Sequence, residues 1–336
     1  MRRRDFITIL GGATAFQGFR TLAQLPARRP IIGSIVAGSN AATEQRRSGF
    51  PQGMKELGYV EGRDYVIEGR YGDGDVARLP ALVEELVRLK PQVILTGTTV
   101  AAREIERTAK TIPVVGVSLT DPVGFGLAAS LAAPGGQTTG ILIISDNFAS
   151  KQVGLALEVV PGARTIGMLV NAGNQSSLVH RRNVESAVGA SIKFVPGDVH
   201  KPDDIDRAFE AFAREHVDVL LVPPDGLFVS ESRRIVTLAA AARLPALYPY
   251  RELVEAGGLM SYGVDLRESW RRAATFVDKI LKGARPGDLP IEQPTNELVI
   301  NKKAAQTLEL TISPAVLRRA DQIIGRHDAN RPPSFA

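Results

Sequence analysis

Two stretches of similar build decide the fold: QVILTGTTVAAREIERTAKTIPVV at residues 92–115 and DVLLVPPDGLFVSESRRIVTLAAAARLPAL at residues 218–247. In each stretch a short apolar run leads through a polar loop and a helical segment to a second apolar run that begins at a proline. Proline has no backbone N–H to donate, so the first residue of a strand is one of the few places in a sheet where it is tolerated. Each stretch therefore predicts a strand, a helix and a parallel strand, and their likeness predicts two halves of one build.

Further apolar runs of strand length lie on both sides of these stretches. Most are continuously apolar, as expected for parallel strands that helices cover on both faces. The predicted strands are residues 31–37, 93–96, 114–118, 141–144, 166–170, 217–222, 246–248, 259–262 and 297–301. Apolar residues at helical spacing over 79–89 and 270–280 predict two core-facing helices, with Trp270 in the core. The predicted fold class is α/β, with two doubly wound parallel-sheet lobes.

The order of these elements predicts that the chain crosses between the lobes three times. The expected crossings lie near residues 145–148, 262–264 and 293–295, and together they would form a multi-strand hinge. The predicted organisation is a leader at 1–29, a first lobe at 30–146 plus 263–292, a second lobe at 147–262 plus 293–326, and a tail at 327–336.

The first 29 residues carry the net charge of the chain. The formal charge of +5 equals the balance of six arginines and one aspartate in this segment, so the remaining chain is neutral and gives no reason to expect a nucleic-acid partner. Three arginines, a short apolar run and small residues follow one another, which is the pattern of an export signal. The paired arginines resemble a twin-arginine signal, and we expect a periplasmic protein. The alternative is a frayed basic terminus of a soluble protein.

Several kinds of chemistry are excluded or disfavoured by residue content. The chain has no cysteine, which excludes disulfides, thiolate catalysis and cysteine-ligated zinc. The four histidines, at positions 180, 200, 216 and 327, do not have the spacing of a metal site. The sequence GFGLAA at 124–129 matches a dinucleotide fingerprint, but it follows the wrong strand for that role. We therefore expect no metal and no cofactor.

Ligands of open α/β sheets bind at the carboxyl ends of the strands, where this chain has hydroxyl, amide, carboxylate and aromatic side chains. The predicted ligand-binding residues are Ser39, Asn40, Thr98, Thr99, Asp121, Phe148, Asn174, Ser176, Asp225, Phe228 and Tyr248. Thr98 and Thr99 precede a helix, so their hydroxyls and nearby N–H groups could hold a carboxylate. Either Asp121 or Asp225 could pair with a ligand ammonium.

Each of these residues also has a purely structural interpretation. Thr98, Asn174 and similar residues are common helix N-caps, and an aspartate before proline or glycine is common in turns. The rings of Phe148, Phe228 and Tyr248 could be partly buried at the rim of a lobe instead of stacking on a ligand. The sequence leaves these alternatives open for every single residue.

Several motifs resemble one family. They are LGYVEGR at 57–63, DPVG at 121–124, APGGQTTG at 133–140, AGGLMSYG at 256–263 and VDKILKGA at 277–284. Over about residues 30–324 the chain resembles the ABC transporter substrate-binding proteins of the tryptophan-binding-protein type. The resemblance implies a type I periplasmic-binding fold that closes on a ligand and delivers it to a membrane permease with a cytoplasmic ATPase. Known ligands of the family include aromatic amino acids.

These observations give one functional hypothesis and two alternatives. We expect a monomeric periplasmic solute-binding protein of an ABC importer, without catalysis, which captures a small carboxylate-bearing ligand such as an aromatic amino acid between its lobes. Its expected partners are that ligand and an inner-membrane permease. One alternative is a secreted hydrolase or oxidoreductase that uses the same cleft. A LacI-like regulator shares the fold but would need a DNA-binding segment where this chain has its leader.

Overall fold

The structure is a computed structural model that describes residues 29–38, 40–144 and 147–325. The predicted leader up to residue 28, Ser39, the first two residues of the first predicted crossing and the predicted tail lie outside the described residues. Within the described ranges, no helix combines the length and apolar composition needed to cross a membrane.

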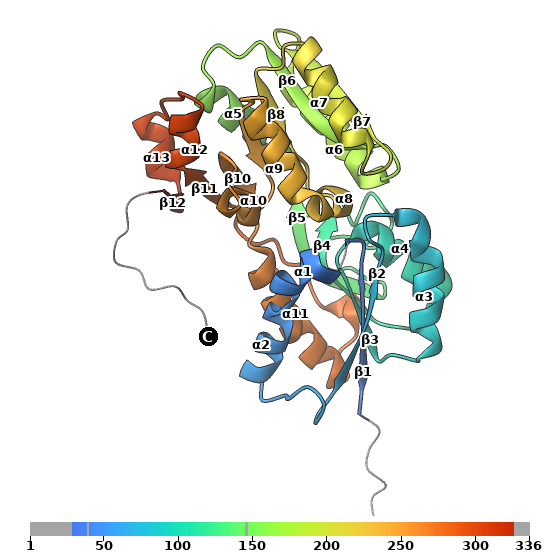
Figure 1. The fold of residues 1–336 in the computed structure, drawn as a ribbon. Helices are drawn as coiled ribbons and strands as arrows, with labels where there is room; N and C mark the ends of the chain where they lie inside the picture. Colours follow the sequence, from blue (N-terminus) through green and yellow to red (C-terminus); the bar gives the residue numbers. More distant parts are fainter. Residues whose placement is uncertain (1–28, 39, 145–146, 326–336) are drawn as a thin grey trace, which may run out of the picture.

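The first lobe is built on a five-stranded parallel sheet in the order β2-β1-β3-β4-β5 (Figure 1). Its strands are β1 (Ile31–Val36), β2 (Val66–Tyr71), β3 (Val93–Thr96), β4 (Val114–Thr120) and β5 (Thr138–Ile144). A single parallel bridge adds Glu292 to the outer side of β5 at Ile141.

The second lobe is built on a seven-stranded sheet in the order β12-β11-β10-β9-β8-β6-β7, in which only the β10–β11 pair is antiparallel. Its strands are β6 (Thr165–Asn171), β7 (Lys193–Val199), β8 (Val219–Leu221), β9 (Ala246–Tyr248), β10 (Met260–Gly263), β11 (Glu297–Asn301) and β12 (Gln322–Ile324). The carboxyl ends of its parallel strands and those of the first sheet meet between the lobes (Figure 1).

Helices cover both faces of each sheet. The first lobe contains α1 (Asn40–Arg47), α2 (Gly49–Glu56), α3 (Leu79–Arg88), α4 (Thr99–Thr108) and α11 (Leu266–Leu281), with short 3-10 turns at Val76–Arg78 and Pro286–Asp288. The second contains α5 (Phe148–Val159), α6 (Gln175–Val188), α7 (Asp204–Arg214), α8 (Gly226–Ser230), α9 (Ser232–Ala241), α10 (Arg251–Glu255), α12 (Lys302–Thr307) and α13 (Pro314–Arg319). On β3, Ile94 packs toward α3 and α4, while Leu95 packs toward α2 and α11. Both lobes are doubly wound, which confirms the predicted fold class.

Helix α11 belongs to the first lobe although it follows a strand of the second. It packs against α2, where Gly49 and Gly53 allow the close approach, because a Cβ atom at either position would collide with the carbonyl oxygen of Arg267 or Arg271. The chain therefore passes between the lobes three times: between β5 and α5, between β10 and α11, and between Glu292 and β11 (Figure 1).

Three strands were not predicted from the sequence: β2, β7 and β12. All three lie at the edge of a sheet. Their residues are half-buried or alternate between buried and exposed, and β7 includes Pro196 and Gly197, so none has the continuous apolar run that identified the central strands.

Candidate functional site

A cavity lies between the two lobes. The ends of β1, β3 and β4 and the start of α11 form its wall in the first lobe, and the starts of α6 and α8 and the residue before α10 form its wall in the second. Five of the predicted ligand-binding residues line this cavity: Thr98, Thr99, Asn174, Ser176 and Asp225. The structure thus brings predicted residues from both lobes together around one space.

Two helices from opposite lobes begin at the cavity. Thr98 is the N-cap of α4, where its hydroxyl accepts a hydrogen bond from the N–H of Ala101 at 3.2 Å. Asn174 is the N-cap of α6, where its Oδ1 accepts from the N–H of Ser176 at 3.0 Å. The start of a helix carries partial positive charge and N–H groups that point out of the helix. The two helix starts therefore make the cavity favourable for an anionic group.

The hydroxyl of Thr99 has a structural task. It accepts a hydrogen bond from the N–H of Thr120 at 2.7 Å and donates to the carbonyl of the same residue at 3.0 Å. These bonds fix the end of β4 against the start of α4 and use the only proton that the hydroxyl can donate. The donors that α4 offers to a ligand are consequently its backbone N–H groups and the hydroxyl of Thr98.

Asp225 places a buried carboxylate in the cavity wall. Its Oδ1 accepts from Nδ2 of Asn171 at 3.0 Å and from the N–H of Leu227 at 2.8 Å, and its Oδ2 accepts from Nδ2 of Asn174 at 2.7 Å. Burial raises the pKa of the Asp225 carboxyl, and the hydrogen bonds oppose that shift only in part. Because all of these partners are neutral amides, the site holds a carboxylate that a cationic ligand group would stabilise.

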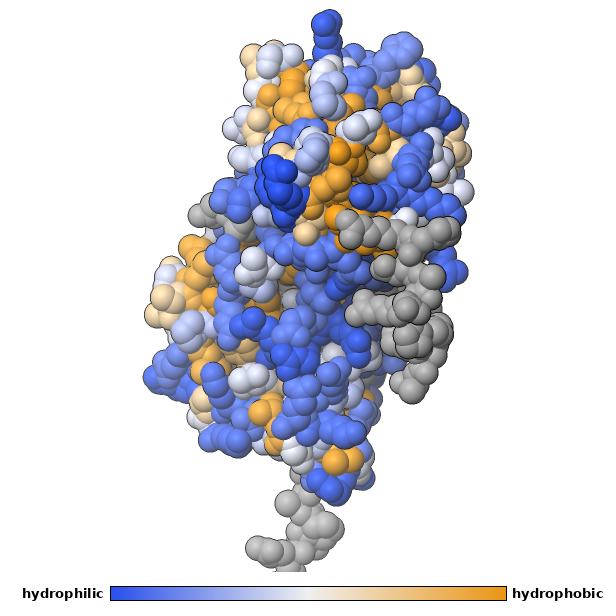
Figure 2. Space-filling model, turned by 90° about the vertical axis from the view of Figure 1, so that its left-hand side faces the viewer, coloured by the Kyte–Doolittle hydropathy of each residue, from blue (hydrophilic) through white to orange (hydrophobic). Residues whose placement is uncertain are grey.

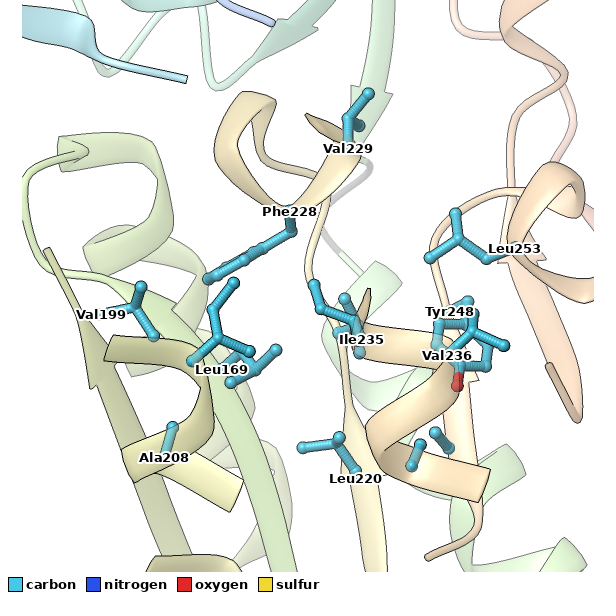
Figure 3. Close-up of a cluster of buried hydrophobic side chains, with 14 of the residues drawn as sticks. Leu169, Val199, Ala208, Leu220, Phe228, Val229, Ile235, Val236, Tyr248 and Leu253 are labelled. Atoms are coloured by element: carbon cyan, nitrogen blue, oxygen red, sulfur yellow. The ribbon is translucent and has the colours of Figure 1, made fainter. Parts of the chain in front are cut away.

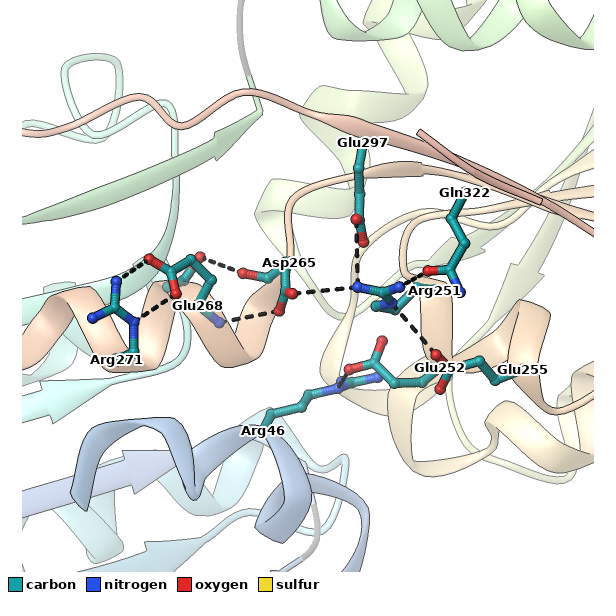
Figure 4. Close-up of polar contacts among 10 residues, drawn as sticks. Arg46, Arg251, Glu252, Glu255, Asp265, Glu268, Arg271, Glu297 and Gln322 are labelled. Atoms are coloured by element: carbon teal, nitrogen blue, oxygen red, sulfur yellow. Dashed lines mark hydrogen bonds and ion pairs between the residues drawn. The ribbon is translucent and has the colours of Figure 1, made fainter. Parts of the chain in front are cut away.

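The polar residues of the cavity that are absent from the predicted set include Arg46 and Tyr250. The guanidinium of Arg46 lies 4.9 Å from the centroid of the Tyr250 ring, and its Nε donates to Oε1 of Glu252 at 2.8 Å. Arg46 comes from α1 of the first lobe, whereas Tyr250 and Glu252 come from the second, so this contact joins the lobes (Figure 4). Both Arg46 and Tyr250 are buried.

Trp270 has two roles in the structure. It is 4% exposed and packs in the core of the first lobe, as the helical spacing predicted. It also lines the cavity, together with Leu266 at the start of α11. A core position and a place in the ligand cavity are compatible here because the cavity begins where the core of the first lobe ends.

Three predicted aromatic residues do not line the cavity. Phe228 and Tyr248 are buried in the core of the second lobe (Figure 3). Phe148 is buried against the rings of His180 and Tyr262, each with its centroid 5.7 Å away. These three rings do not line the cavity, and they are buried more completely than the partial burial at a lobe rim that was the alternative interpretation.

Asp121 does not line this cavity but a neighbouring groove, which Ser176 and His180 also line. Its carboxylate accepts from the N–H of Gly124 at 2.8 Å, which is the turn interaction expected of such a residue. Of the other two predicted positions, Ser39 is outside the described residues, and for Asn40 the structure describes only the backbone, at the start of α1. Among the described residues, no group of three or more His, Asp or Glu side chains is placed to hold a metal ion.

Two α/β lobes that enclose a cavity with anion-binding helix starts define a two-lobed ligand-binding protein. The sequence profile described as "ABC transporter substrate binding protein" matches residues 32–324. The chain therefore belongs to the substrate-binding protein family of ABC transporters, which confirms the resemblance seen in its motifs.

Three relatives illustrate the similarity. The tyrosine-binding protein of Clostridioides difficile (strain R20291) is 24% identical over 270 residues, which are 80% of this chain and 77% of that protein. A conserved domain protein from Vibrio cholerae has a crystal structure that superposes with a TM-score of 0.82 at 29% identity, over 88% of this chain and all of the other. An ABC domain from Streptococcus pneumonia in complex with L-Trp has a TM-score of 0.80 at 27% identity, over the same shares.

Proposed function

We propose that the protein captures an aromatic amino acid between its lobes and delivers it to an ABC importer. The observation that carries this proposal is that one cavity combines two helix starts from opposite lobes, a buried carboxylate, and the rings of Tyr250 and Trp270. An amino acid carries a matching carboxylate and ammonium and, when aromatic, a ring. The L-Trp complex and the tyrosine-binding relative support this ligand class.

The cavity suggests a role for each group. The backbone N–H groups at the starts of α4 and α6 bind the ligand carboxylate. Asp225 accepts the ligand ammonium, and the ring of the ligand packs beside Tyr250 and Trp270. The ligand is bound without covalent chemistry and released unchanged, so a hydrolase or oxidoreductase that uses this cleft is not favoured.

We place this activity in the periplasm, in line with the export signal in the sequence. The protein acts as a monomer that presents the ligand to an inner-membrane permease, and it needs neither nucleic acid nor a cofactor. The lobes move about the three connections, with lobe boundaries after residues 146, 262 and 292.

The proposal is tested by titration calorimetry with L-tryptophan, L-tyrosine, tryptamine and indole-3-propionate. Tryptamine lacks the carboxylate and indole-3-propionate lacks the ammonium, and each should bind at least about tenfold more weakly than L-tryptophan because one buried charged partner is left unpaired. If none of the four binds, or if all four bind alike, the assignment of an amino-acid site is wrong.

The role of Asp225 has its own comparison. Asp225→Asn should weaken L-tryptophan at least about tenfold and leave indole-3-propionate within about twofold, since only the first ligand has an ammonium. Asp121→Asn is the matched control, because Asp121 does not line the cavity. The affinity of this variant for both ligands should equal that of the wild type. Equal losses for both ligands in Asp225→Asn would show a general disturbance of the site instead of a lost ammonium contact.

A further inference from the structure

Three consecutive residues around the start of α10 connect three different parts of the molecule. Tyr250 lines the ligand cavity, Arg251 contacts the residues that flank two of the lobe connections, and Glu252 pairs with Arg46 of the first lobe (Figure 4). The helix itself is only five residues long, so these contacts lie within about two turns of one another. A movement at any one of the three contacts therefore displaces the other two.

The contact between Arg46 and Glu252 forms only when the lobes are together. Arg46 is on α1 in the first lobe and Glu252 on α10 in the second, 206 residues apart in the chain. The side chain of Arg46 is 7% exposed and that of Glu252 is 23% exposed, so the pair is well shielded from water. A shielded pair of this kind depends far more on its partner than an ion pair on an open surface does.

Arg46 also belongs to the ligand cavity. It lines the cavity beside Thr43, and its guanidinium lies over the ring of Tyr250, which lines the same cavity from the other lobe. Its side chain thus contacts the ligand space, the opposite lobe and α10 at once. On the face of the molecule that Figure 2 shows, hydrophilic residues predominate near the middle.

The lobe connections complete this arrangement. The Nη1 of Arg251 lies 3.5 Å from a carboxylate oxygen of Asp265 and 3.5 Å from one of Glu297. Asp265 is the N-cap of α11, two residues after β10, and Glu297 is the first residue of β11, so these carboxylates flank the second and third connections (Figure 4). Helix α10 is in this way tied to the connections about which the lobes would move.

We propose that Arg46 and Glu252 form a latch that holds the lobes closed and that Arg46 makes this latch sensitive to the ligand. Arg46 is a positioning residue, which acts through Tyr250 and α10 on the closed arrangement of the lobes. A ligand beside Tyr250 would order Arg46 in the position in which it pairs with Glu252, so the latch would set how long the ligand is held. The inference deepens the proposed function and rests on it for the ligand, but the latch itself can be measured without any ligand.

The experiment measures closure directly. Because the full chain has no cysteine, Glu84→Cys on α3 and Glu210→Cys on α7 give one exposed fluorophore site in each lobe. Single-molecule energy transfer between the labels then reports the ratio of compact to open molecules, without ligand and with L-tryptophan. The variants are Glu252→Gln, which removes the charge that Arg46 binds, and Arg46→Lys, which keeps the cationic charge but loses the planar guanidinium.

Glu255→Gln is the matched control, since Glu255 lies on the same helix and, within the part of the chain that the structure describes, forms its ion pair with Arg251 of its own lobe, at 3.4 Å. Glu252→Gln should lower the ratio of compact to open molecules at least about tenfold and speed L-tryptophan release by a similar factor, because a shielded charge loses its partner. Arg46→Lys should give an intermediate ratio, and Glu255→Gln should stay within about twofold of the wild type, as expected for a pair exposed to solvent.

The outcomes separate the two proposals. A compact-to-open ratio in Glu252→Gln within about twofold of the wild type overturns the latch, even if the ligand binds more weakly, because Arg46 would then act on the ligand alone. Failure of the wild type to bind L-tryptophan or L-tyrosine contradicts the proposed ligand class, while the ratio measured without ligand still decides the latch.

Discussion

His180 and Asp225 are both buried in the second lobe, and burial shifts their pKa values in opposite directions. Loss of hydration disfavours the charged form, so it lowers the pKa of the His180 ring to about 4 and raises the pKa of the Asp225 carboxyl. The carboxylate of Asp225 accepts several hydrogen bonds from amides, whereas Nδ1 of His180 has no hydrogen-bond partner in the part of the chain that the structure describes. The Asp225 side chain can therefore bind a ligand as a charged carboxylate, while the His180 ring is a neutral part of the core.

The shift at His180 predicts a loss of stability in acid. The ring has an ordinary pKa of 6.5 when the chain is unfolded and about 4 when it is folded, so the unfolded state binds the proton more tightly. Stability is complete above pH 6.5 and falls as the pH drops from 6.5 toward 4, by about 3 kcal/mol in total. His180→Gln should remove this part of the pH dependence, measured as the free energy of unfolding in urea at several pH values.

The control for this prediction is His200→Gln, because His200 is exposed on the surface of the second lobe. The free energy of unfolding of His200→Gln should change with pH in parallel with that of the wild type. The free energy of unfolding of the wild type minus that of His180→Gln should fall by about 3 kcal/mol on going from pH 7 to pH 4. Parallel curves for all three proteins would mean that His180 takes up its proton as easily in the folded protein as in the unfolded one.

Cavity residues that begin a helix could be predicted from the sequence. Residues whose place in the cavity depends on the direction of the side chain could not. Thr98, Asn174 and Asp225 precede helices at the carboxyl ends of strands, and each is both an N-cap and a wall of the cavity. Tyr248 and Tyr250 are two residues apart and belong to the same core cluster, yet of the two only Tyr250 also lines the cavity. Arg46 had no local signal, since its role depends on Glu252, 206 residues away.

At the scale of elements, burial decided which strands could be predicted. Central strands such as β3 and β4 are buried on both faces and have continuous apolar runs. The edge strands β2, β7 and β12 have one open side and mixed residues, so only the sheet itself identifies them, whereas the edge strand β5 is buried along almost its whole length and was predicted. Helix α11 was predicted from its apolar spacing, but its contact with α2 depends on two glycines whose meaning appears only when the helices are packed.

The contact between α2 and α11 predicts that alanine at Gly53 destabilises the protein, the opposite of its effect at a glycine inside a helix with free space around it. Gly53→Ala puts a methyl group against the carbonyl of Arg271, so the helices must separate, at a cost of about 2 kcal/mol or more. Because Trp270 is carried on α11, this variant should also weaken L-tryptophan binding. The midpoint of urea unfolding and the affinity for L-tryptophan are the measurements.

Gly154→Ala is the matched control within a helix. Gly154 lies inside α5, and a Cβ atom there would meet nothing within 4 Å. Alanine at this position should stabilise the protein by about 0.5–1 kcal/mol, because it restricts the unfolded chain and favours the helix. If Gly53→Ala is as stable as Gly154→Ala, the close approach of α2 and α11 is not what requires glycine.

At the scale of the whole molecule, the lobes meet through small residues around the cavity. A Cβ atom on Gly226 of α8 would lie 2.9 Å from the Cβ of Ala37 and 3.4 Å from the N of Gly38, at the end of β1. On the same side, a Cβ on Gly74 of the first lobe would lie 3.7 Å from the Cβ of Leu227. The close approach of the lobes around the cavity thus depends on these small residues, in addition to the three connections and the contact between Arg46 and Glu252.

The distance between Gly74 and Leu227 permits a covalent test of closure. A disulfide needs Cβ atoms about 3.5–4.5 Å apart, so Gly74→Cys with Leu227→Cys should form one across the lobes. Gly74 has a φ of +85°, and cysteine there costs about 1 kcal/mol or somewhat more, which a bridged protein of this size tolerates. Because the chain has no other cysteine, no competing disulfide can form.

The order of oxidation and ligand addition then decides whether ligand exchange requires the lobes to separate. If the double variant is oxidised before L-tryptophan is added, it should take up the ligand at least about a hundredfold more slowly than the same protein under reducing conditions, since residues of both lobes line the cavity and the bridged lobes cannot part. Oxidised after loading, it should retain L-tryptophan through extensive dialysis and release it when dithiothreitol is added. The reduced double variant is its own control, because it contains the same substitutions without the bridge. Equal uptake and release rates in the oxidised and reduced forms would show that the ligand reaches the cavity by a path that does not need the lobes to open.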